Sequence, residues 1–257
     1  LGIKGAAIAT TIGRSIGVLF ALHRLFKVGS RVELHARHFA FDPALILRVI
    51  RLSSSATLQV FIGMASWIGL VRILATFGSA ALAGYTIGIR IVIFALLPSA
   101  GLANAAATMV GQALGARKPE RAERAVWTAG RYSMWFLGAV GLLFVIFAPP
   151  IVSIFTADPA VARFAVATLR TVALGFPFYA YGMVFTQSFN GAGDTRTPTY
   201  INLFVFWLFE IPLAWVLANT AGFGPQGAFA AATVAFCTLA VVSAVLFRRG
   251  HWKRQRV

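Results

Sequence analysis

Glu210 is the acidic residue of this 257-residue chain that lies deep inside a long apolar stretch. A charged side chain in the middle of a bilayer is costly, so an ionisable group there is a functional candidate. A carboxylate in that position can take up a proton or a cation, which favours a role in ion coupling or cation binding. The alternative is structural: an ion pair with Arg90 or Arg170, or a position in a wet cavity near a helix end. The sequence leaves both readings open.

Five further residues within apolar stretches are candidates for lining a path for a substrate or an ion. They are Gln59, Tyr85, Arg90, Tyr179 and Gln187. Arg90 lies in the middle of its stretch, so we expect it to face the protein interior or a cavity. Gln59 can hydrogen-bond a substrate, and the two tyrosines offer cation–π surfaces to lipophilic cations. Many aromatic residues in such stretches face lipid instead.

The apolar stretches hold no arrangement of side chains typical of catalysis. They contain no Ser-His-Asp, Cys-His or paired-carboxylate constellation. The single cysteine, Cys237, excludes a disulfide framework and a cysteine-based metal cluster. We therefore expect no enzyme, no metal site and no catalytic residue.

The elements that must position these residues are membrane-spanning helices. Hydrophobic residues make up 59% of the chain, charged residues 12%, and the mean hydropathy is +0.80. A bilayer core of roughly 30 Å requires about 20 apolar residues of helix, and the chain supplies that length about seven times. The predicted spans cover residues 2–22, 45–76, 80–114, 121–147, 160–189, 198–218 and 226–247. The sequence predicts an all-α integral membrane protein.

Basic residues alternate with uncharged connections along the chain. Lys and Arg gather in residues 23–51, 117–131 and 248–256 and at Arg196, whereas the connections at 76–80, 148–160 and 219–226 contain none. Basic loops stay on the cytoplasmic side, so we expect the C-terminus to be cytoplasmic and the protein to lie in the plasma (inner) membrane. The net charge of +16 then reflects topology and contact with anionic lipids. A nucleic-acid partner is not expected.

Two features indicate an internal repeat and kinked helices. A Gly-x-x-Gly-Ala-x-x-Ala pattern at residues 2–9 recurs at residues 224–231. Both copies open spans that run in the same direction, as expected if each closes one of two parallel six-helix repeats. Pro98, Pro177 and Pro212 fall inside spans, where each removes a backbone hydrogen bond and is expected to kink its helix.

Three passages give the chain a resemblance to a known family. The passage 187–198, Gln-Ser-Phe-Asn-Gly-Ala-Gly-Asp-Thr-Arg-Thr-Pro, matches the cytoplasmic turn of the multidrug and toxic compound extrusion (MATE) family of cation-coupled antiporters. Residues 98–116 resemble that family's span preceding a charged loop, and residues 5–10 are typical of its sixth span. The motif positions are Pro98, Gly111, Gln112, Gly115, Gly191, Gly193, Asp194 and Pro198.

The motif residues have a mainly architectural interpretation. Gly191 and Gly193 permit left-handed backbone where one helix reverses into the next, and Asp194 can accept hydrogen bonds from nearby backbone amides. The passage from Gly111 to Ala116 is typical of a helix end.

The resemblance implies a twelve-helix transporter of two six-helix lobes. This chain would hold the last span of the N-terminal lobe (1–22), a basic cytoplasmic linker (23–44), the C-terminal six-helix lobe (45–247) and a basic cytoplasmic tail (248–257). Its partners would be the lipid bilayer, small-molecule drugs or organic cations, and the missing N-terminal lobe. Some members place an acidic cation-site residue in the segment that holds Gln59, so this amide argues against a carboxylate there.

The function implied is secondary active efflux of lipophilic, often cationic compounds in exchange for Na⁺ or H⁺ by alternating access. No cofactor is implied beyond the coupling ion. A flippase for lipid-linked saccharides, from the same superfamily, is an alternative for which we expect a strongly cationic cavity. A non-transporting membrane scaffold is the alternative from a different class.

Overall fold

The computed structural model describes residues 2–26 and 42–254, and this part of the chain is helical, with no β-strand. The chain separates into two compact units, residues 1–50 and 51–257. The first unit contains α1 (Gly2–Phe26) and the beginning of α2 (Pro43–Ala75). Most of the predicted linker at 23–44 and the end of the predicted tail lie outside the described residues.

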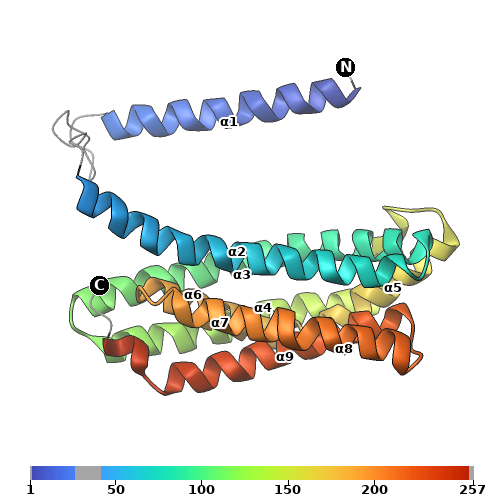
Figure 1. Cartoon of the computed structure of the whole chain (residues 1–257). Coiled ribbons are helices and arrows are strands. Elements are labelled where there is room, and N and C mark those ends of the chain that lie inside the picture. Colours follow the sequence, from blue (N-terminus) through green and yellow to red (C-terminus); the bar gives the residue numbers. More distant parts are fainter. Residues whose placement is uncertain (1, 27–41, 255–257) are drawn as a thin grey trace. The chain divides into compact units, whose positions relative to one another are not determined.

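The second unit is a bundle of long helices that begins within α2 (Figure 1). After α2 come α3 (Ser79–Gly115), α4 (Pro119–Ser153), α5 (Pro159–Leu174), α6 (Phe176–Gly191), α7 (Arg196–Asn202), η2 (Leu203–Glu210), α8 (Ile211–Trp215), η3 (Val216–Thr220), α9 (Pro225–Arg248) and η4 (His251–Arg254). Helix α3 packs against α4, α5 and α6, and α6 also packs against α9.

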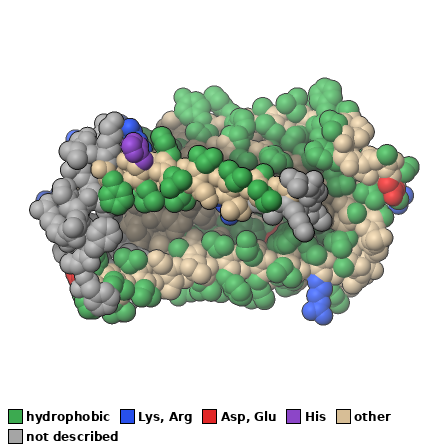
Figure 2. Space-filling model, turned by 90° about the horizontal axis from the view of Figure 1, so that it is seen from above, with side chains coloured by type: hydrophobic (Ala, Val, Ile, Leu, Met, Phe, Trp, Pro, Cys, Tyr) green, Lys and Arg blue, Asp and Glu red, His purple; other side chains and the backbone are tan. Residues whose placement is uncertain are grey.

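The lengths and compositions of these helices suit a membrane. Among the described residues, five helices are long and apolar enough to cross one, or six if the bent pair α5–α6 counts as one span. Hydrophobic side chains cover much of the surface seen in Figure 2, and charged ones are sparse. Six of the seven predicted spans correspond to these elements. The stretch predicted at 2–22 is helical as α1, and its place in the bilayer stays a prediction.

The pairs Asp42-Pro43, Asp158-Pro159 and Thr197-Pro198 each place a capping oxygen before a proline and predict a helix start. The first two are confirmed, whereas α7 begins at Arg196, before the third pair. Asp158 accepts hydrogen bonds from the backbone amides of Ala160 and Val161, at 2.8 and 3.4 Å, and α5 opens with Pro159. Asp42 caps α2 in the same way, with Ala44 N donating over 2.9 Å. An aspartate before a proline therefore marks the start of α2 and of α5.

Two boundaries differ from the sequence prediction. The span predicted at 160–189 is broken at Gly175, and its halves α5 and α6 are bent by 59°, with Pro177 in the first turn of α6. The span predicted to end at 147 continues as α4 to Ser153, across a kink at Phe147 that precedes Pro149 and Pro150. Prolines that follow a break within one helical turn are compatible with the new helix, because its first amides need no intrahelical partner.

The helix that carries Glu210 has a local π-helical geometry. Segment η2 ends at Glu210, and Pro212 lies in the first turn of α8. Because Pro212 donates no hydrogen bond, the backbone pattern before it is disturbed. A π-helical turn is one way in which a membrane helix accommodates such a proline. By contrast, α3 passes Pro98 as one helix.

Candidate functional site

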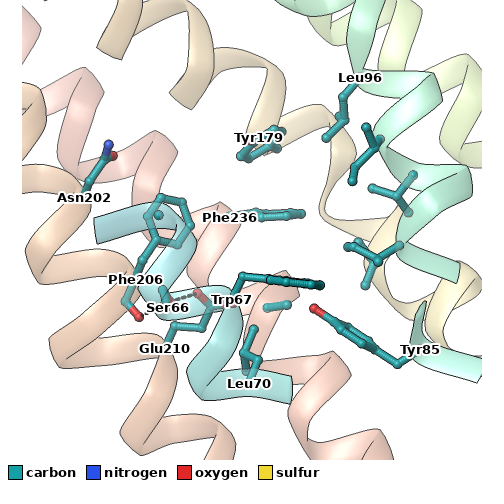
Figure 3. A pocket seen from close by; sticks show the side chains of 16 residues that line it. Ser66, Trp67, Leu70, Tyr85, Leu96, Tyr179, Asn202, Phe206, Glu210 and Phe236 are labelled. Atoms are coloured by element: carbon teal, nitrogen blue, oxygen red, sulfur yellow. Dashed lines mark hydrogen bonds between the residues drawn. The ribbon is translucent and has the colours of Figure 1, made fainter. Parts of the chain in front are cut away.

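A cavity of about 360 Å³ opens between helices of the second unit, with Glu210 on its wall (Figure 3). Its lining comes from α2, α3, α5, α6, α9 and the α7–η2 helix. The lining residues are Gly63, Ser66, Trp67, Leu70, Tyr85, Ile89, Val92, Ile93, Leu96, Val172, Tyr179, Asn202, Phe206, Glu210, Ala232 and Phe236. A mainly apolar wall with a few convergent polar groups is typical of a small-molecule site.

Glu210 is only 4% exposed, and its hydrogen-bond partner in the described part of the chain is Ser66 of α2. The Ser66 hydroxyl donates to the carbonyl oxygen of Phe206 over 2.8 Å and lies 3.5 Å from Glu210 Oε2. Ser66 thus hydrogen-bonds the π-helical backbone at Phe206 and also contacts the carboxyl group of Glu210. The carboxylate bond is the longer and weaker of the two.

The ion pair considered from the sequence is not present. Among the described residues, Glu210 has no salt bridge, and the cavity lining contains no Lys, Arg or His. Arg170 donates from Nε to the carbonyl oxygen of Val145 over 3.0 Å. Arg90 is exposed on this chain and does not line this cavity. That it faces the protein interior or a cavity stays a prediction.

Aromatic rings form much of the cavity wall. Tyr179 packs on Phe236 with ring centroids 4.2 Å apart, and Tyr85 stacks on Phe229 at 6.0 Å. Figure 3 shows the Tyr85 hydroxyl directed toward Trp67 at the side of the cavity near Glu210. These faces offer apolar and cation–π contact beside a carboxyl group.

A second polar cluster joins four amide side chains, which we call the amide chain: Asn104, Gln187, Asn190 and Gln59. Gln187 Nε2 donates to Asn104 Oδ1 over 2.9 Å, and Asn190 Nδ2 donates to Gln187 Oε1 over 2.8 Å. Gln59 Nε2 donates to Asn190 Oδ1 over 3.1 Å and to the carbonyl oxygen of Thr195 over 2.9 Å. The chain of bonds ties α3, α6 and α2 to the turn before α7.

Two glycines in that region have different structural roles. Gly193 has φ +79°, as predicted for a left-handed turn residue. Gly191 does not, which corrects the prediction: a Cβ there would clash with the carbonyl oxygen of Ala107 and lie 2.6 Å from its Cα. Gly191 is therefore required for the close approach of α6 to α3. Gly111 faces the same contact, since a Cβ on it would lie 3.1 Å from Gly191 O.

The remaining motif residues lie at the ends of the same helices. Asp194 accepts from the backbone amide and the hydroxyl of Thr197, at 3.1 and 2.6 Å, as expected for a capping carboxylate. Helix α3 ends at Gly115, as its motif predicts, with Gln112 exposed in its last turn. Pro198 is buried in the first turn of α7.

The structure therefore separates the candidate residues into two groups and leaves one apart. Tyr85, Tyr179 and Glu210 line the cavity, Gln59 and Gln187 belong to the amide chain, and Arg90 lies outside both.

Ser66, Asn202 and Phe236 are among the lining residues that sequence reasoning missed. For Asn202 a signal existed, because it lies eight residues before Glu210, about two turns along the same stretch.

Comparison with known proteins identifies the family. The MatE family model matches residues 54–216, more than half of the chain. The chain is 24% identical over its full length to a probable multidrug resistance protein NorM of Thermotoga maritima and 28% identical to that of Caulobacter vibrioides. It covers 55% of each, so it spans about half the length of these curated relatives.

Solved structures show the same fold. The chain matches an outward-facing multidrug resistance MATE family transporter of the MOP superfamily with a TM-score of 0.90 at 22% identity. The match covers 97% of this chain and 56% of that one. A MOP superfamily transporter from Pyrococcus furiosus, whose binding pocket is described as having reverse polarity, matches with a TM-score of 0.92 at 22% identity, over 99% and 58% of the two chains. The fold is that of half of a two-lobe transporter, and the chain belongs to the MatE family of integral membrane transporters.

Proposed function

We propose that this chain is the C-terminal half of a secondary active exporter that exchanges lipophilic, often cationic compounds for Na⁺ or H⁺. Members of this family are transporters and not enzymes. The observation that carries the proposal is a buried carboxyl group on the wall of an aromatic cavity, with no basic side chain among the lining residues.

The coupling follows from the electrostatics of that carboxyl group. An ionised Glu210 needs a compensating positive charge in its low-dielectric surroundings, and no Lys, Arg or His in the cavity lining supplies one. A proton, Na⁺ or a cationic drug can each provide it. If the bound ion and the drug exclude one another and favour opposite faces of the transporter, uptake of one drives release of the other.

The cavity also fits the proposed cargo. Its volume of about 360 Å³ lies in the range of small-molecule sites. The rings of Trp67, Tyr85, Tyr179 and Phe236 supply apolar surface near one carboxyl group. The same composition disfavours the flippase alternative, for which a strongly cationic cavity is expected. A scaffold without transport has no need for an unpaired carboxyl group in such a cavity.

The rest of the assembly is part of the proposal. The missing partner is an N-terminal six-helix lobe, since the relatives are nearly twice as long as this chain. The distribution of basic residues supports insertion in the plasma (inner) membrane with the C-terminus in the cytoplasm.

Transport by the full-length protein in proteoliposomes tests the proposal. We expect efflux of an ethidium-type cation to require a Na⁺ or H⁺ gradient and to be independent of ATP. Glu210→Gln keeps the shape of the side chain and can still accept from Ser66, so stability should be retained. Transport should fall by tenfold or more and lose its dependence on the ion.

Glu120→Gln is the matched control, because that carboxyl group is exposed at the start of α4, outside the cavity. It should transport normally. Efflux that needs ATP and persists without an ion gradient would refute the antiport mechanism. Normal, ion-dependent efflux by Glu210→Gln would remove Glu210 from coupling.

A further inference from the structure

A basic cup lies at the turn between α3 and α4, remote in sequence from the cavity residues that surround Glu210. It is a hollow of about 490 Å³ lined by Arg117, Lys118, Pro119, Glu120, Arg121 and Arg124. Four cationic side chains and one carboxyl group leave an excess of three positive charges. All four cations are exposed. Such a concentration of charge favours an anionic ligand that carries one or more phosphate groups.

The C-terminal segment strengthens this positive field. Glu123, the other acidic residue in the first turns of α4, forms a salt bridge with Lys253 of η4, with Nζ and Oε2 2.6 Å apart. Segment η4 is anchored by Trp252, which is 1% exposed and donates from Nε1 to the carbonyl oxygen of Phe247 over 2.9 Å. The carboxylate of Glu123 is thus engaged with Lys253 rather than with the cup.

The backbone of the cup includes an arginine where glycine is the easier residue. Arg117 has φ +57°, and Lys118 N donates to Ala113 O over 2.8 Å, which closes the end of α3. Helix α6 ends in the same way, with Asp194 N bonded to Phe189 O over 3.0 Å, but there the left-handed residue is Gly193. A non-glycine residue at this position carries a conformational cost. An arginine at a position with this cost favours a role for its charged side chain in the cup.

The exposed face of α4 shows where the cup lies relative to lipid. Positions 121, 124, 131, 132, 135, 142 and 143 share one face of the helix, given 3.6 residues per turn. Along it, Arg121, Arg124 and Arg131 are followed by Tyr132 and Trp135, which are 59% and 63% exposed and pack edge-to-face at 6.4 Å. Exposed Leu142 and Leu143 come next.

That order of cations, aromatic residues and aliphatic residues matches the layers of one leaflet. Tyr and Trp are enriched at the interface between headgroups and hydrocarbon. Arg124 lies about two helical turns beyond Tyr132, on the side away from the hydrocarbon. The cup is therefore placed beside or just outside the headgroup layer.

From this geometry we propose that the cup formed by residues 117–124 binds the phosphate headgroup of an anionic phospholipid. The acyl chains would lie along the aromatic and aliphatic part of the same α4 face. The site is separate from transport chemistry and does not depend on the proposed antiport.

Lipid binding to the purified full-length transporter tests the proposal. The probes are cardiolipin and phosphatidylglycerol, with phosphatidylcholine as the neutral comparison, and the readouts are lipid retention in native mass spectrometry and the thermal unfolding midpoint. The double variant Arg121→Gln/Arg124→Gln should bind the anionic lipids about thirtyfold more weakly, since each cation near a membrane surface contributes roughly a fivefold factor. Its stability in phosphatidylcholine should be unchanged.

Matched controls separate a specific cup from general attraction. Arg72→Gln/Arg163→Gln removes two exposed cations that lie outside the cup and should leave anionic lipid binding within about twofold of the wild type. Equal losses in both double variants would overturn the proposal. Equal protection by millimolar inorganic phosphate would also overturn it, because the ligand would then be a soluble anion.

Arg117→Gly examines the strained position directly. Glycine relieves the left-handed backbone, so the variant should be at least as stable as the wild type in phosphatidylcholine. It should still lose about fivefold in affinity for the anionic lipids. Full retention of lipid binding would overturn the role given to Arg117.

Discussion

The cavity around Glu210 and the amide chain are two polar regions of the same apolar lobe, and they differ in how fully their side chains are hydrogen-bonded. In the amide chain, Gln59, Gln187 and Asn190 each both donate and accept side-chain hydrogen bonds, and none carries a charge. In the cavity, Glu210 has one long bond to Ser66 and an open volume beside it. A closed neutral network stabilises one arrangement of helices, whereas an ionisable group with few partners is available to a ligand.

The difference also concerns how the helices are held. The amide chain lies at the close crossing of α3 and α6, which Gly191 and Gly111 permit. The cavity is bordered by a π-helical segment and by α2, whose Ser66 supports the irregular backbone at Phe206. Tight packing accompanies the closed network, and irregular backbone accompanies the open site.

Gly191→Ala should break the first region and have the largest effect. The added Cβ meets the backbone of Ala107, which cannot move aside as a flexible side chain could. We expect a loss of about 3 kcal/mol of stability, at the upper end of overpacking effects, with separation of α6 from α3. The unfolding midpoint of the full-length protein in detergent measures it.

Gly115→Ala is the control for this prediction. A Cβ on Gly115 meets nothing within 4 Å among the described residues, and Gly115 is the last residue of α3. That variant should be as stable as the wild type. Wild-type stability of Gly191→Ala would show that the crossing of α3 and α6 is not as tight as described.

Much of this architecture could be predicted from the sequence, because it depends on local properties. Hydropathy located the spans, and oxygen-bearing residues before prolines located the starts of α2 and α5. Kinks were expected near Pro177 and Pro212, but the complete break at Gly175, the π-helical form of the segment before Pro212 and the continuation of α4 past Phe147 were not predicted. They depend on which neighbouring helices take up the backbone groups that a proline leaves free.

The site was predicted residue by residue but not as a constellation. Tyr85, Tyr179 and Glu210 were each chosen for their chemistry, and only the packing of distant helices brings them to one cavity. The ion pair weighed as one alternative for Glu210 is absent among the described residues for the same reason: a mid-span arginine such as Arg90 is exposed or buried according to the helices that cover it. Ser66 was missed because an isolated serine in an apolar stretch carries little signal.

Gln59→Glu should make the amide chain more like the Glu210 cavity, because it places a charge in a network that is neutral. Gln59 Nε2 donates to Asn190 Oδ1 and to Thr195 O, and a carboxylate would oppose both acceptors. We expect a loss of about 2 kcal/mol of stability, from the broken bonds and the repulsion. Urea or thermal unfolding of the full-length protein checks the value.

Gln59→Met removes the same bonds without adding a charge. Its cost should be nearer 1 kcal/mol, since Thr195 O keeps the donors Ser55 and Thr199. A Gln59→Glu variant as stable as Gln59→Met would mean that the amide chain tolerates a charge. The amide chain and the Glu210 cavity would then differ only in the open volume beside the polar groups.

Ser66→Ala should have the smallest effect on stability, and it tests the Glu210 cavity instead of the amide chain. The change removes the donor to Phe206 O and the weak bond to Glu210. Because the Phe206 carbonyl lies in a π-helical turn, losing that donor should lower the free energy of unfolding by about 1 kcal/mol. The transport rate should fall by more than this loss of stability alone would cause.

Ser243→Ala is the matched control, since the Ser243 hydroxyl is buried without a hydrogen-bond partner among the described residues. Removing an unsatisfied hydroxyl should be neutral or slightly stabilising and should leave transport unchanged. If Ser66→Ala behaves like Ser243→Ala in both stability and transport, Ser66 does not support the Glu210 site. The position of the carboxyl group would then not depend on a hydrogen bond from α2.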